Sequence, residues 1–363
     1  MLTRRRFVFL AGSIVPAFLV ALPLLVGVRT AAEALPSRLT DQEFWKLVTD
    51  FSEADGTFRS DNLLSNEVWL QHVIPDLLKT AKPNRVYVGV GPEQNFTYIA
   101  ALKPAMAFIV DIRRGNLDLH LVYKALFEMS PDRAEFVSRL FARARPAGLT
   151  EASTAGEIFD AFAAVERSET LYQENLEAIE GVLVKKHGFG LSDVDLAGLE
   201  HVYHSFSTFG PKIQYSSTGS GYYGASRQPS YADLMTATDG EGVSRSYLAS
   251  EESFRFLKEL HAKNLLVPMV GNFAGPKAIR AVSDYIKDKG GIVSAFYLSN
   301  VEMYLGPDGL MQSFCRNVAT LPLDQSSTFI RSLRGGRYGR GFGQGFGLGS
   351  QLGAMAAEVE QCR

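Results

Sequence analysis

Two glycines and an acid at the ends of two apolar runs are the residues of this sequence best placed to bind a nucleoside. Gly89 and Gly91 end the run that starts at Arg85, and Asp111 ends the next run, twenty residues after Gly91. Glycine lets the backbone approach a ligand closely, and a carboxylate accepts hydrogen bonds from ribose hydroxyls. The pattern predicts a nucleoside site in which Asp111 binds the ribose and Gly89, Gly91 and Glu93 lie along the ligand. The alternatives are a glycine turn used for geometry alone and an acid in a surface loop.

Polar residues also follow two later apolar runs. Asn272 and Phe273 follow the run that ends at residue 270, and Asn300 and Glu302 follow the run that ends at residue 298. Because ligands bind beyond the carboxyl ends of parallel strands, we expect Asn272 and Phe273 to contribute to cofactor binding. Asn300 and Glu302 are predicted catalytic residues on the substrate side. Asn272 has a second interpretation, as the cap of the helix that starts near residue 275.

His204 is the third predicted catalytic residue, as a general base. The six histidines form no metal signature, because His201 and His204 are three residues apart and no Glu completes an H-E-x-x-H frame. We therefore expect no metal site. The sequence also lacks a G-x-S-x-G elbow and a Walker loop, which argues against an α/β-hydrolase and a P-loop NTPase.

A long segment from about 214 to 246 is predicted to be a substrate loop, because long irregular loops in compact domains are usually lids or binding loops. It contains Gly-Ser-Gly-Tyr-Tyr-Gly at 219–224, a formal match to G-x-G-x-x-G. A dinucleotide turn must open a helix after a strand, whereas Pro229 follows five residues later. We therefore do not interpret this match as a dinucleotide site. The polar run from Asp61 to Glu67 has two interpretations, as a cover over the pocket or as the capped start of a helix.

Apolar runs alternate with helical patterns along most of the chain, which indicates a parallel sheet covered on both faces. We expect strands at 85–90, 106–112, 265–270, 291–298 and 329–333, and a further strand at 202–209 or 212–216. The predicted fold class is α/β, a doubly wound, mostly parallel Rossmann sheet with N-terminal helices. One domain is expected to cover residues 38–333.

Two regions depart from a simple doubly wound domain. Residues 145–200 are helix-prone and exceed what one crossover needs, so they predict an inserted helical cap. Residues 334–363 are predicted to be a flexible tail, because the Gly-rich run up to residue 350 cannot bury enough apolar surface to offset chain entropy. Arginine and aromatic residues among glycines can bind single-stranded nucleic acid, but a flexible tail is the simpler interpretation.

The first 34 residues are predicted to be an export signal. Arg4-Arg5-Arg6-Phe7 fits the twin-arginine pattern, an uncharged apolar stretch continues to Val28, and Ala32-Glu33-Ala34 fits a cleavage site. We therefore predict a protein that is periplasmic or otherwise exported. The alternative is an uncleaved membrane anchor, since the apolar stretch is long enough to span a bilayer.

Composition excludes few functions but limits the partners. The 363 residues are 46% hydrophobic, enough for a substantial core, and the formal charge of −2 gives no reason to expect a nucleic-acid partner. The partner we expect is a small-molecule substrate. Cys315, in an expected strand, and Cys362 could pair in an oxidising compartment, but we expect a buried Cys315 and a loose Cys362.

Several runs, taken together, resemble a known family. They are DNLLSNE at 61–67, VGVGPEQN at 88–95, YLASEE at 247–252, VPMVGNFAG at 267–275 and AFYLSNVEMYL at 295–305. The set resembles a poorly characterised bacterial family of exported proteins with a class I methyltransferase-like Rossmann core, over about residues 40 to 330. The glycine loop with Asp111 is similar to the first motif of class I S-adenosylmethionine-dependent methyltransferases. Val88 stands where those enzymes carry an acid.

The resemblance implies a methyltransferase or a methyltransferase-like nucleoside-binding protein, with S-adenosylmethionine as the cofactor. The reaction would be an in-line displacement in which the protein supplies positioning and desolvation. The alternative is a non-catalytic envelope protein that has the fold but binds another small ligand or a protein partner, because a fold does not determine a function.

Overall fold

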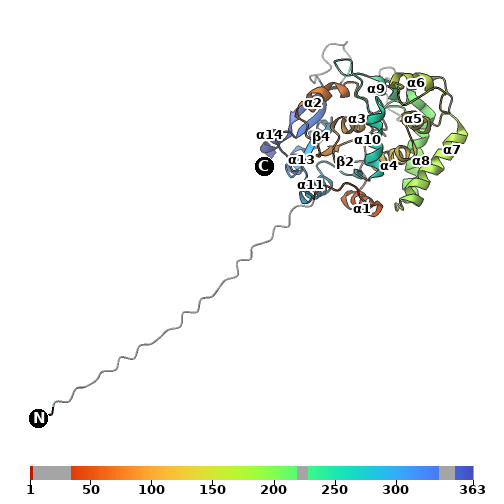
Figure 1. Ribbon diagram of the computed structural model, residues 1–363. Coiled ribbons are helices and arrows are strands. Elements are labelled where there is room, and N and C mark those ends of the chain that lie inside the picture. The colour runs from red at the N-terminus through yellow and green to blue at the C-terminus, as the bar shows by residue number, and fades with distance from the viewer. Residues whose placement is uncertain (3–33, 219–227, 335–347, 363) are drawn as a thin grey trace. The chain divides into compact units, whose positions relative to one another are not determined.

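The computed structural model describes residues 1–2, 34–218, 228–334 and 348–362 (Figure 1). Contacts group Ala32–Arg363 into one compact unit, separate from Met1–Ala31. Most of the expected export signal, the G-x-G-x-x-G match and most of the Gly-rich run therefore lie outside the described residues. Among the described residues, no helix is both long enough and apolar enough to cross a membrane.

The centre of the fold is a six-stranded sheet. Its strands are β1 (Val86–Gly89), β2 (Met106–Asp111), β3 (Leu266–Val270), β4 (Val293–Ser299), β5 (Thr328–Arg334) and β6 (Leu348–Ala354). The order across the sheet is β3-β2-β1-β4-β5-β6, with β1 to β5 parallel and β6 antiparallel to β5. The sequence-based prediction of an α/β, Rossmann-like doubly wound fold is confirmed.

Helices connect and cover the strands. Those up to residue 141 are α1 (Asp41–Phe51), η1 (Leu70–Val73), α2 (Ile74–Thr80), α3 (Gln94–Leu102), α4 (Arg114–Met129) and α5 (Arg133–Phe141). The next are α6 (Ala155–Ala163), α7 (Glu169–Glu180), η2 (Gly181–Lys186), α8 (Asp193–Phe209), η3 (Gly210–Lys212) and α9 (Tyr231–Thr236). The last are α10 (Glu251–Ala262), α11 (Ala278–Asp288), α12 (Glu302–Leu305), α13 (Met311–Val318), α14 (Met355–Val359) and η5 (Glu360–Cys362).

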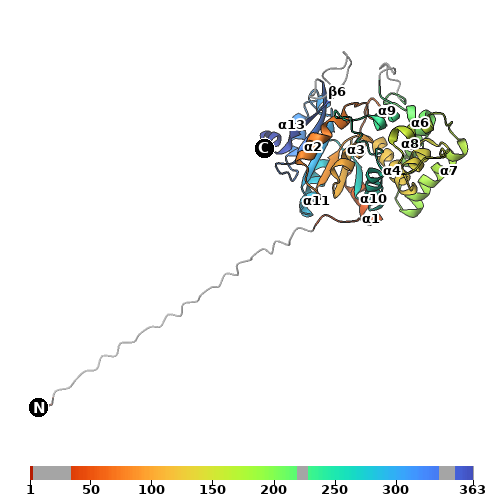
Figure 2. The ribbon, with the colours of Figure 1, turned by 45° about the horizontal axis from the view of Figure 1, so that its top comes forward.

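The two faces of the sheet carry different helices. Right-handed crossovers place α3 and α4 on one face and α11 and α13 on the other, because the chain moves across the sheet in opposite directions before and after β3. Figure 2 shows α2, α3 and α10 side by side, and α3 contacts both neighbours. Strands β1, β2 and β3 are fully buried, as their continuous apolar runs predict.

The extra strand that we expected at 202–209 or 212–216 is absent from those described residues. Residues 202–209 belong to α8, and 212–216 form the end of η3 and a turn. Ser192 caps α8 by accepting a hydrogen bond from the N–H three residues on. Val202 and Phe206 are buried at helical spacing, so the aromatic run is the inner face of a helix. The expected helical cap therefore extends to the end of α8.

The C-terminal part is more ordered than the expected flexible tail. Residues 335–347 lie outside the described residues, but 348–354 form β6, which pairs with β5 along its length despite two glycines. A disulfide joins Cys315 to Cys362. Cys315 lies on α13 rather than in a strand, so our expectation of two separate cysteines is wrong.

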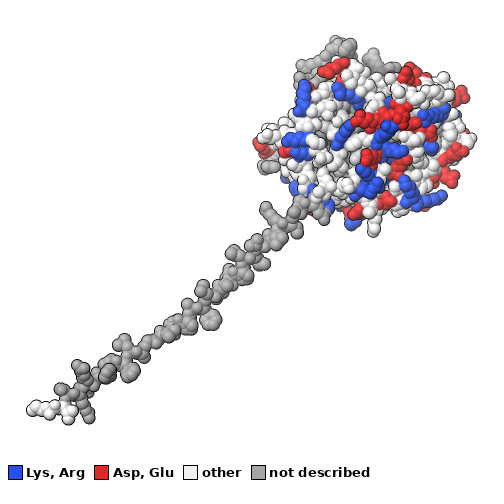
Figure 3. Space-filling model, viewed as in Figure 1, with Lys and Arg blue, Asp and Glu red and all other residues white. Residues whose placement is uncertain are grey.

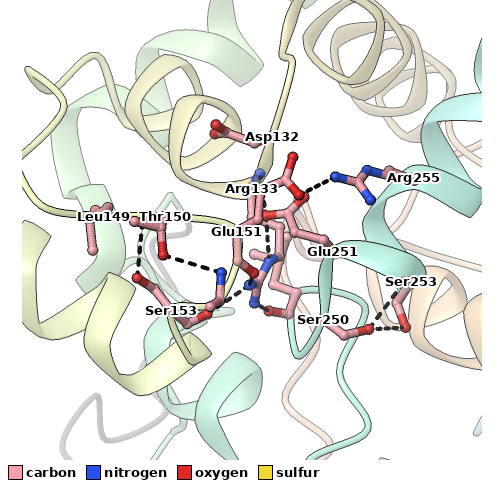
Figure 4. Close-up of polar contacts among 12 residues, drawn as sticks. Asp132, Arg133, Leu149, Thr150, Glu151, Ser153, Ser250, Glu251, Ser253 and Arg255 are labelled. Carbon is pink, nitrogen blue, oxygen red and sulfur yellow. Dashed lines mark hydrogen bonds and ion pairs between the residues drawn. The ribbon is translucent and has the colours of Figure 1, made fainter.

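A buried arginine attaches the helical cap to the sheet domain (Figure 4). Arg133, at the start of α5, donates through Nε to Glu251 at the start of α10, at 2.8 Å. Its remaining guanidinium nitrogens donate to the carbonyl oxygens of Leu248, Glu151 and Ser153. Every guanidinium nitrogen is therefore bonded, which a buried arginine requires.

Surface charges of both signs are interspersed on the face seen in Figure 3. This face therefore carries no broad field of one sign, of the kind that attracts a polyanion.

Candidate functional site

The carboxyl ends of four parallel strands meet at one edge of the sheet, called here the carboxyl edge. Gly89 ends β1, Asp111 ends β2, and Ser299 ends β4. Because β1 lies between β2 and β4, the strand order reverses at β1, which is where open α/β sheets bind ligands. The glycine loop after β1 and the acid that ends β2 therefore lie side by side, as the sequence predicts.

The conformation and packing of the loop after β1 require glycine at both positions. Gly91 has φ of 78°, a left-handed conformation that glycine adopts without strain. A Cβ atom on Gly89 would lie 2.0 Å from Oδ1 of Asn95. The Asn95 amide nitrogen donates to the carbonyl oxygens of Val90, Gly91 and Pro92 and so fixes the loop. The glycines are thus required by the loop whether or not a ligand approaches it.

Asp111 is buried, which rules out the alternative of a surface-loop acid. Its Oδ1 accepts from the backbone N–H of Arg113 at 3.0 Å and from Nε at 3.1 Å, and its Oδ2 accepts from Nη2 at 3.1 Å. Arg113 also donates to the carbonyl oxygen of Asp61. A carboxylate has about four lone-pair positions, so Oδ2 keeps one for a ligand hydroxyl.

A segment of residues 53–69, called here the belt, crosses the carboxyl edge from β3 to β4. The Glu53 N–H donates to the carbonyl oxygen that ends β3, and the Gly56 N–H donates to the residue after β2. The Ser65 N–H donates to the Glu93 carboxyl after β1, at 3.2 Å. The Glu67 carboxyl accepts from Tyr297 and Ser299 of β4, at 2.7 and 2.5 Å. Residues 61–67 therefore lie across the carboxyl edge and do not form the capped start of a helix, which was our other interpretation.

Asn272 and Phe273 support the turn after β3. The Asn272 side-chain oxygen accepts from the Ala274 N–H at 2.9 Å, which is a turn-capping contact. The Glu53 carboxylate accepts from the N–H groups of Asn272, Lys277 and Ala278 and so takes the anion position at the start of α11. Phe273 packs in the core against aromatic rings, so its side chain does not face the edge.

The two predicted catalytic residues after β4 differ in their surroundings. Glu302 pairs with Arg331 of β5, with its two oxygens 2.5 and 3.1 Å from Nε and Nη2. Arg331 also binds Glu358 of α14, so Glu302 belongs to a clamp between β5 and the C-terminal helix. Asn300 is partly exposed beside the end of β4, and its carbonyl oxygen accepts from Met303.

His204 lies in the helical cap. It is exposed on α8, its ring meets that of Tyr172 at 5.9 Å, and its carbonyl oxygen accepts from Ser207. The neighbouring His201 is the α8 histidine that contacts the belt, through Asp61 at 3.0 Å. The structure therefore brings Gly89, Gly91, Glu93 and Asp111 together with Asn300 nearby, and it places His204 elsewhere.

A layer of buried polar side chains between the sheet and α3 was not predicted from the sequence. The hydroxyl of Tyr297 receives a hydrogen bond from Gln94 Nε2 at 3.0 Å and donates to Glu67. Ser332 of β5 and Tyr98 of α3 are buried nearby. The Ser332 hydroxyl lowers the pKa of the Glu67 carboxyl, and burial together with that carboxyl raises the pKa of Tyr98. Three consecutive polar residues at the start of α3, 93–95, were the signal that could have revealed this layer.

Burial makes the two carboxyls of this region hard to ionise. Loss of hydration, and to a smaller extent the nearby Glu67, raise the pKa of Glu93 to about 8 against the opposing effect of backbone N–H groups. Burial also raises the pKa of Glu67, against the opposing effect of three hydroxyl groups. Two adjacent buried carboxyls whose pKa values are both raised are an arrangement that often marks a functional site.

His120 of α4 faces the glycine loop, and the buried Asn116 lies on the same helix. The His120 Nε2 lies 2.9 Å from the Gly91 carbonyl oxygen, so Nε2 carries the proton and Nδ1 has a lone pair. Burial lowers the pKa of His120 to about 4, which keeps the ring neutral. Nδ1 of His120 and both amide atoms of Asn116, one helical turn earlier, find no hydrogen-bond partner within the described part of the chain. Unpartnered buried polar atoms at this edge are what a polar ligand could satisfy.

The opposite, amino edge of the strands carries a pocket of about 630 Å³. Its lining includes Arg85, Ala105, Leu265 and Ile292, which precede β1, β2, β3 and β4. The lysines at its rim follow the last residues of α3, α10 and α11, where cations stabilise helix C-termini. The lysines of this pocket therefore have a structural role at helix C-termini. We take the carboxyl edge as the better candidate site, although the belt covers it.

No group of three or more His, Cys, Asp or Glu residues is arranged to hold a metal ion in the described ranges. A family model described as a domain of unknown function (DUF7790) matches residues 63–186 and 213–351. A search of curated proteins gives no match to this chain.

Proposed function

The chain belongs to the DUF7790 family, and we propose that it binds a small polar ligand of the nucleoside type at the carboxyl edge. The observation that carries the proposal is the position of unpartnered buried polar atoms at the point where strand order reverses. A buried polar group without a partner costs about 1–3 kcal/mol, so a cluster of them favours a ligand-bound state. S-adenosylmethionine is the ligand that we propose first, with methyl transfer as the reaction.

Each residue near the glycine loop has a proposed role. The Asp111 carboxyl, paired with Arg113, accepts a ribose hydroxyl through the free position on Oδ2. Asn116 and the Nδ1 atom of His120 supply further polar contacts. Asn300, at the end of β4, is the predicted catalytic residue best placed for the substrate. Glu302 instead pairs with Arg331 of β5, and His204 packs against Tyr172 in the helical cap.

The sharpest test of this proposal uses Asn116. Replacing an unpartnered buried amide by a leucine, which has the same branched shape, removes an unsatisfied group, so Asn116→Leu should be as stable as wild type or more stable. The same change should weaken S-adenosylmethionine or S-adenosylhomocysteine binding about tenfold, measured by calorimetry. Asp111→Asn should also weaken binding, while Asp308→Asn, on an exposed turn, should not. Wild-type protein that binds neither compound, or an Asn116→Leu variant with unchanged affinity, would refute the proposal.

The belt favours the alternative of a non-catalytic binding protein. It covers the carboxyl edge, and the Glu53 carboxylate already occupies the N–H groups at the start of α11. A protein with this role would keep its ligand without turning it over. Mass analysis of small molecules retained after mild purification distinguishes the two, because a methyltransferase would convert retained S-adenosylmethionine on addition of its acceptor.

Export through the twin-arginine route remains part of the proposal. The disulfide between Cys315 and Cys362 supports it, since disulfides persist mainly in oxidising compartments. Replacement of Arg5 and Arg6 by lysine should retain the protein in the cytoplasmic fraction. Unchanged distribution between fractions would contradict this part of the proposal.

A further inference from the structure

The polar layer between the sheet and α3 contains two side-chain oxygens without a hydrogen-bond partner among the residues described. They are Oε2 of Glu67 and Oε1 of Gln94. Both residues are buried, and so are Tyr98 and Ser332, whose hydroxyl groups interact with Ser350 and with the Glu67 carboxyl. Native structures pair almost all buried polar atoms, so two such oxygens in one layer need an explanation.

Hydrogen-bond directions assign a donor and an acceptor within this group. Tyr297 has one hydroxyl proton and gives it to Oε1 of Glu67, so the group that approaches the Tyr297 oxygen must be a donor. That fixes the Gln94 amide with Nε2 toward Tyr297 and leaves Oε1 as a free acceptor. Oε1 of Glu67 accepts from Tyr297 and Ser299, so the proton of a neutral carboxyl sits on Oε2, a free donor.

We propose that Glu67 and Gln94 together bind a planar ligand group that carries a hydrogen-bond acceptor beside an N–H donor. The amidine edge of an adenine base and a primary carboxamide share this chemistry. The acceptor of the ligand receives the proton of Glu67 Oε2, and its N–H donates to Gln94 Oε1. Tyr297 holds both side chains through hydrogen bonds of 2.7 and 3.0 Å. This inference rests on the proposed function, because both use the carboxyl edge.

The position of the pair separates it from the Asp111 side of the edge. Glu67 and Gln94 contact β4 through Tyr297, whereas Asp111 ends β2, on the other side of β1. A ligand that lies along the glycine loop would therefore have its ribose at Asp111 and its second recognition group, or a second substrate, at Glu67. Glu67 arrives on the belt, so the belt supplies half of this recognition pair.

The test compares two pairs of probes that differ in the N–H donor. Adenosine carries the donor and purine riboside lacks it; nicotinamide carries it and methyl nicotinate lacks it. Affinities are measured by calorimetry with the full-length, disulfide-bonded protein. We expect wild type to prefer the donor-bearing member of one pair by about tenfold or more, since a site with a buried acceptor rejects an analogue that cannot satisfy it. The responding pair shows whether the group is a base or a carboxamide.

Variants separate recognition from a structural role. Gln94→Leu should abolish the preference within the responding pair, while Glu67→Gln should keep it, because the glutamine amide can still accept from Tyr297 and offer a donor in place of Oε2. Gln71→Leu is the matched control. Gln71 is also buried, but its amide is bonded to Leu234, Ala237 and Arg245, so this variant should lose stability and keep the preference.

Equal affinity for both members of each pair in wild type would overturn the inference, and that comparison needs no variant to fold. So would a preference that survives Gln94→Leu, or no binding of any probe, in which case the layer holds ordered water. If S-adenosylmethionine binding depends on Asn116 but neither pair is distinguished, this inference fails and the proposed function stands. If a preference depends on Gln94 but Asn116→Leu and Asp111→Asn bind as wild type, the proposed function fails instead.

Discussion

Replacing Glu93 by glutamine should make the protein less sensitive to rising pH. The Glu93 carboxyl is fully buried and receives the Ser65 N–H of the belt. Burial raises its pKa from 4.5 to about 8. Below pH 4.5 the carboxyl is protonated in both the folded and the unfolded protein, so it does not make stability depend on pH. Between the two values only the unfolded chain releases the proton, which lowers stability as pH rises.

The size of the effect follows from these two pKa values. The free energy of unfolding falls by about 1.4 kcal/mol for each pH unit in this window. From about pH 5.5 to about pH 7.5, the Glu93 carboxyl should therefore cost the wild type roughly 2.5 kcal/mol. Glu93→Gln has no proton to release and keeps an oxygen that can accept from Ser65. Its stability relative to wild type should rise by that amount over the same two units.

Urea unfolding of both proteins at a series of pH values measures this difference. Glu241→Gln, on an exposed turn, is the control and should stay parallel to wild type. A constant offset between Glu93→Gln and wild type across this pH range would show that the carboxyl is hydrated in solution. The belt would then lie away from the glycine loop, and the carboxyl edge would be open to solvent rather than covered.

Three further predictions concern the framework of the fold. Arg133→Met leaves Glu251 buried without its partner and should cost about 3–5 kcal/mol in urea unfolding; a loss below about 1 kcal/mol would show that the cap is attached by other contacts. Removing the disulfide with a Cys315→Ser and Cys362→Ser double variant should cost about 4 kcal/mol by chain entropy for a 47-residue separation, and an unchanged urea midpoint would contradict this estimate. Gly275→Ala would place its Cβ 2.3 Å from a Glu53 oxygen, so Tm should fall, and an unchanged Tm would show that the belt carboxylate does not lie there.

The buried parallel strands were predictable because their signal is local. β1, β2, β3 and β4 are continuous apolar runs that end in glycine or polar residues, and each begins and ends within about two residues of its expected position. The prediction of an extra strand was wrong because, over eight residues, an aromatic run on the buried face of a helix resembles a buried strand. β6 was not predicted for the opposite reason. A Gly-rich segment has no apolar periodicity of its own, and it forms a strand only by pairing with β5.

The candidate site was predictable only in its local part. Gly91 and Asp111 lie twenty residues apart in a strand-helix-strand unit, and their proximity follows from the unit itself. Glu67 meets Tyr297 across 230 residues, and no spacing in the sequence indicates such a contact. Glu302 was predicted as catalytic from its position after β4, but Arg331, contributed by the next strand, binds it.

The path of the belt sets an order of events during synthesis. Residues 53–67 leave the ribosome early, yet Glu67 cannot meet its last partner before Ser299 has been made, 232 residues later. The edge therefore closes only when nearly the whole chain is available. If the chain leaves the cell folded, as the proposed twin-arginine route requires, closure takes place in the cytoplasm. A nucleoside taken up there would already be enclosed when the protein crosses the membrane.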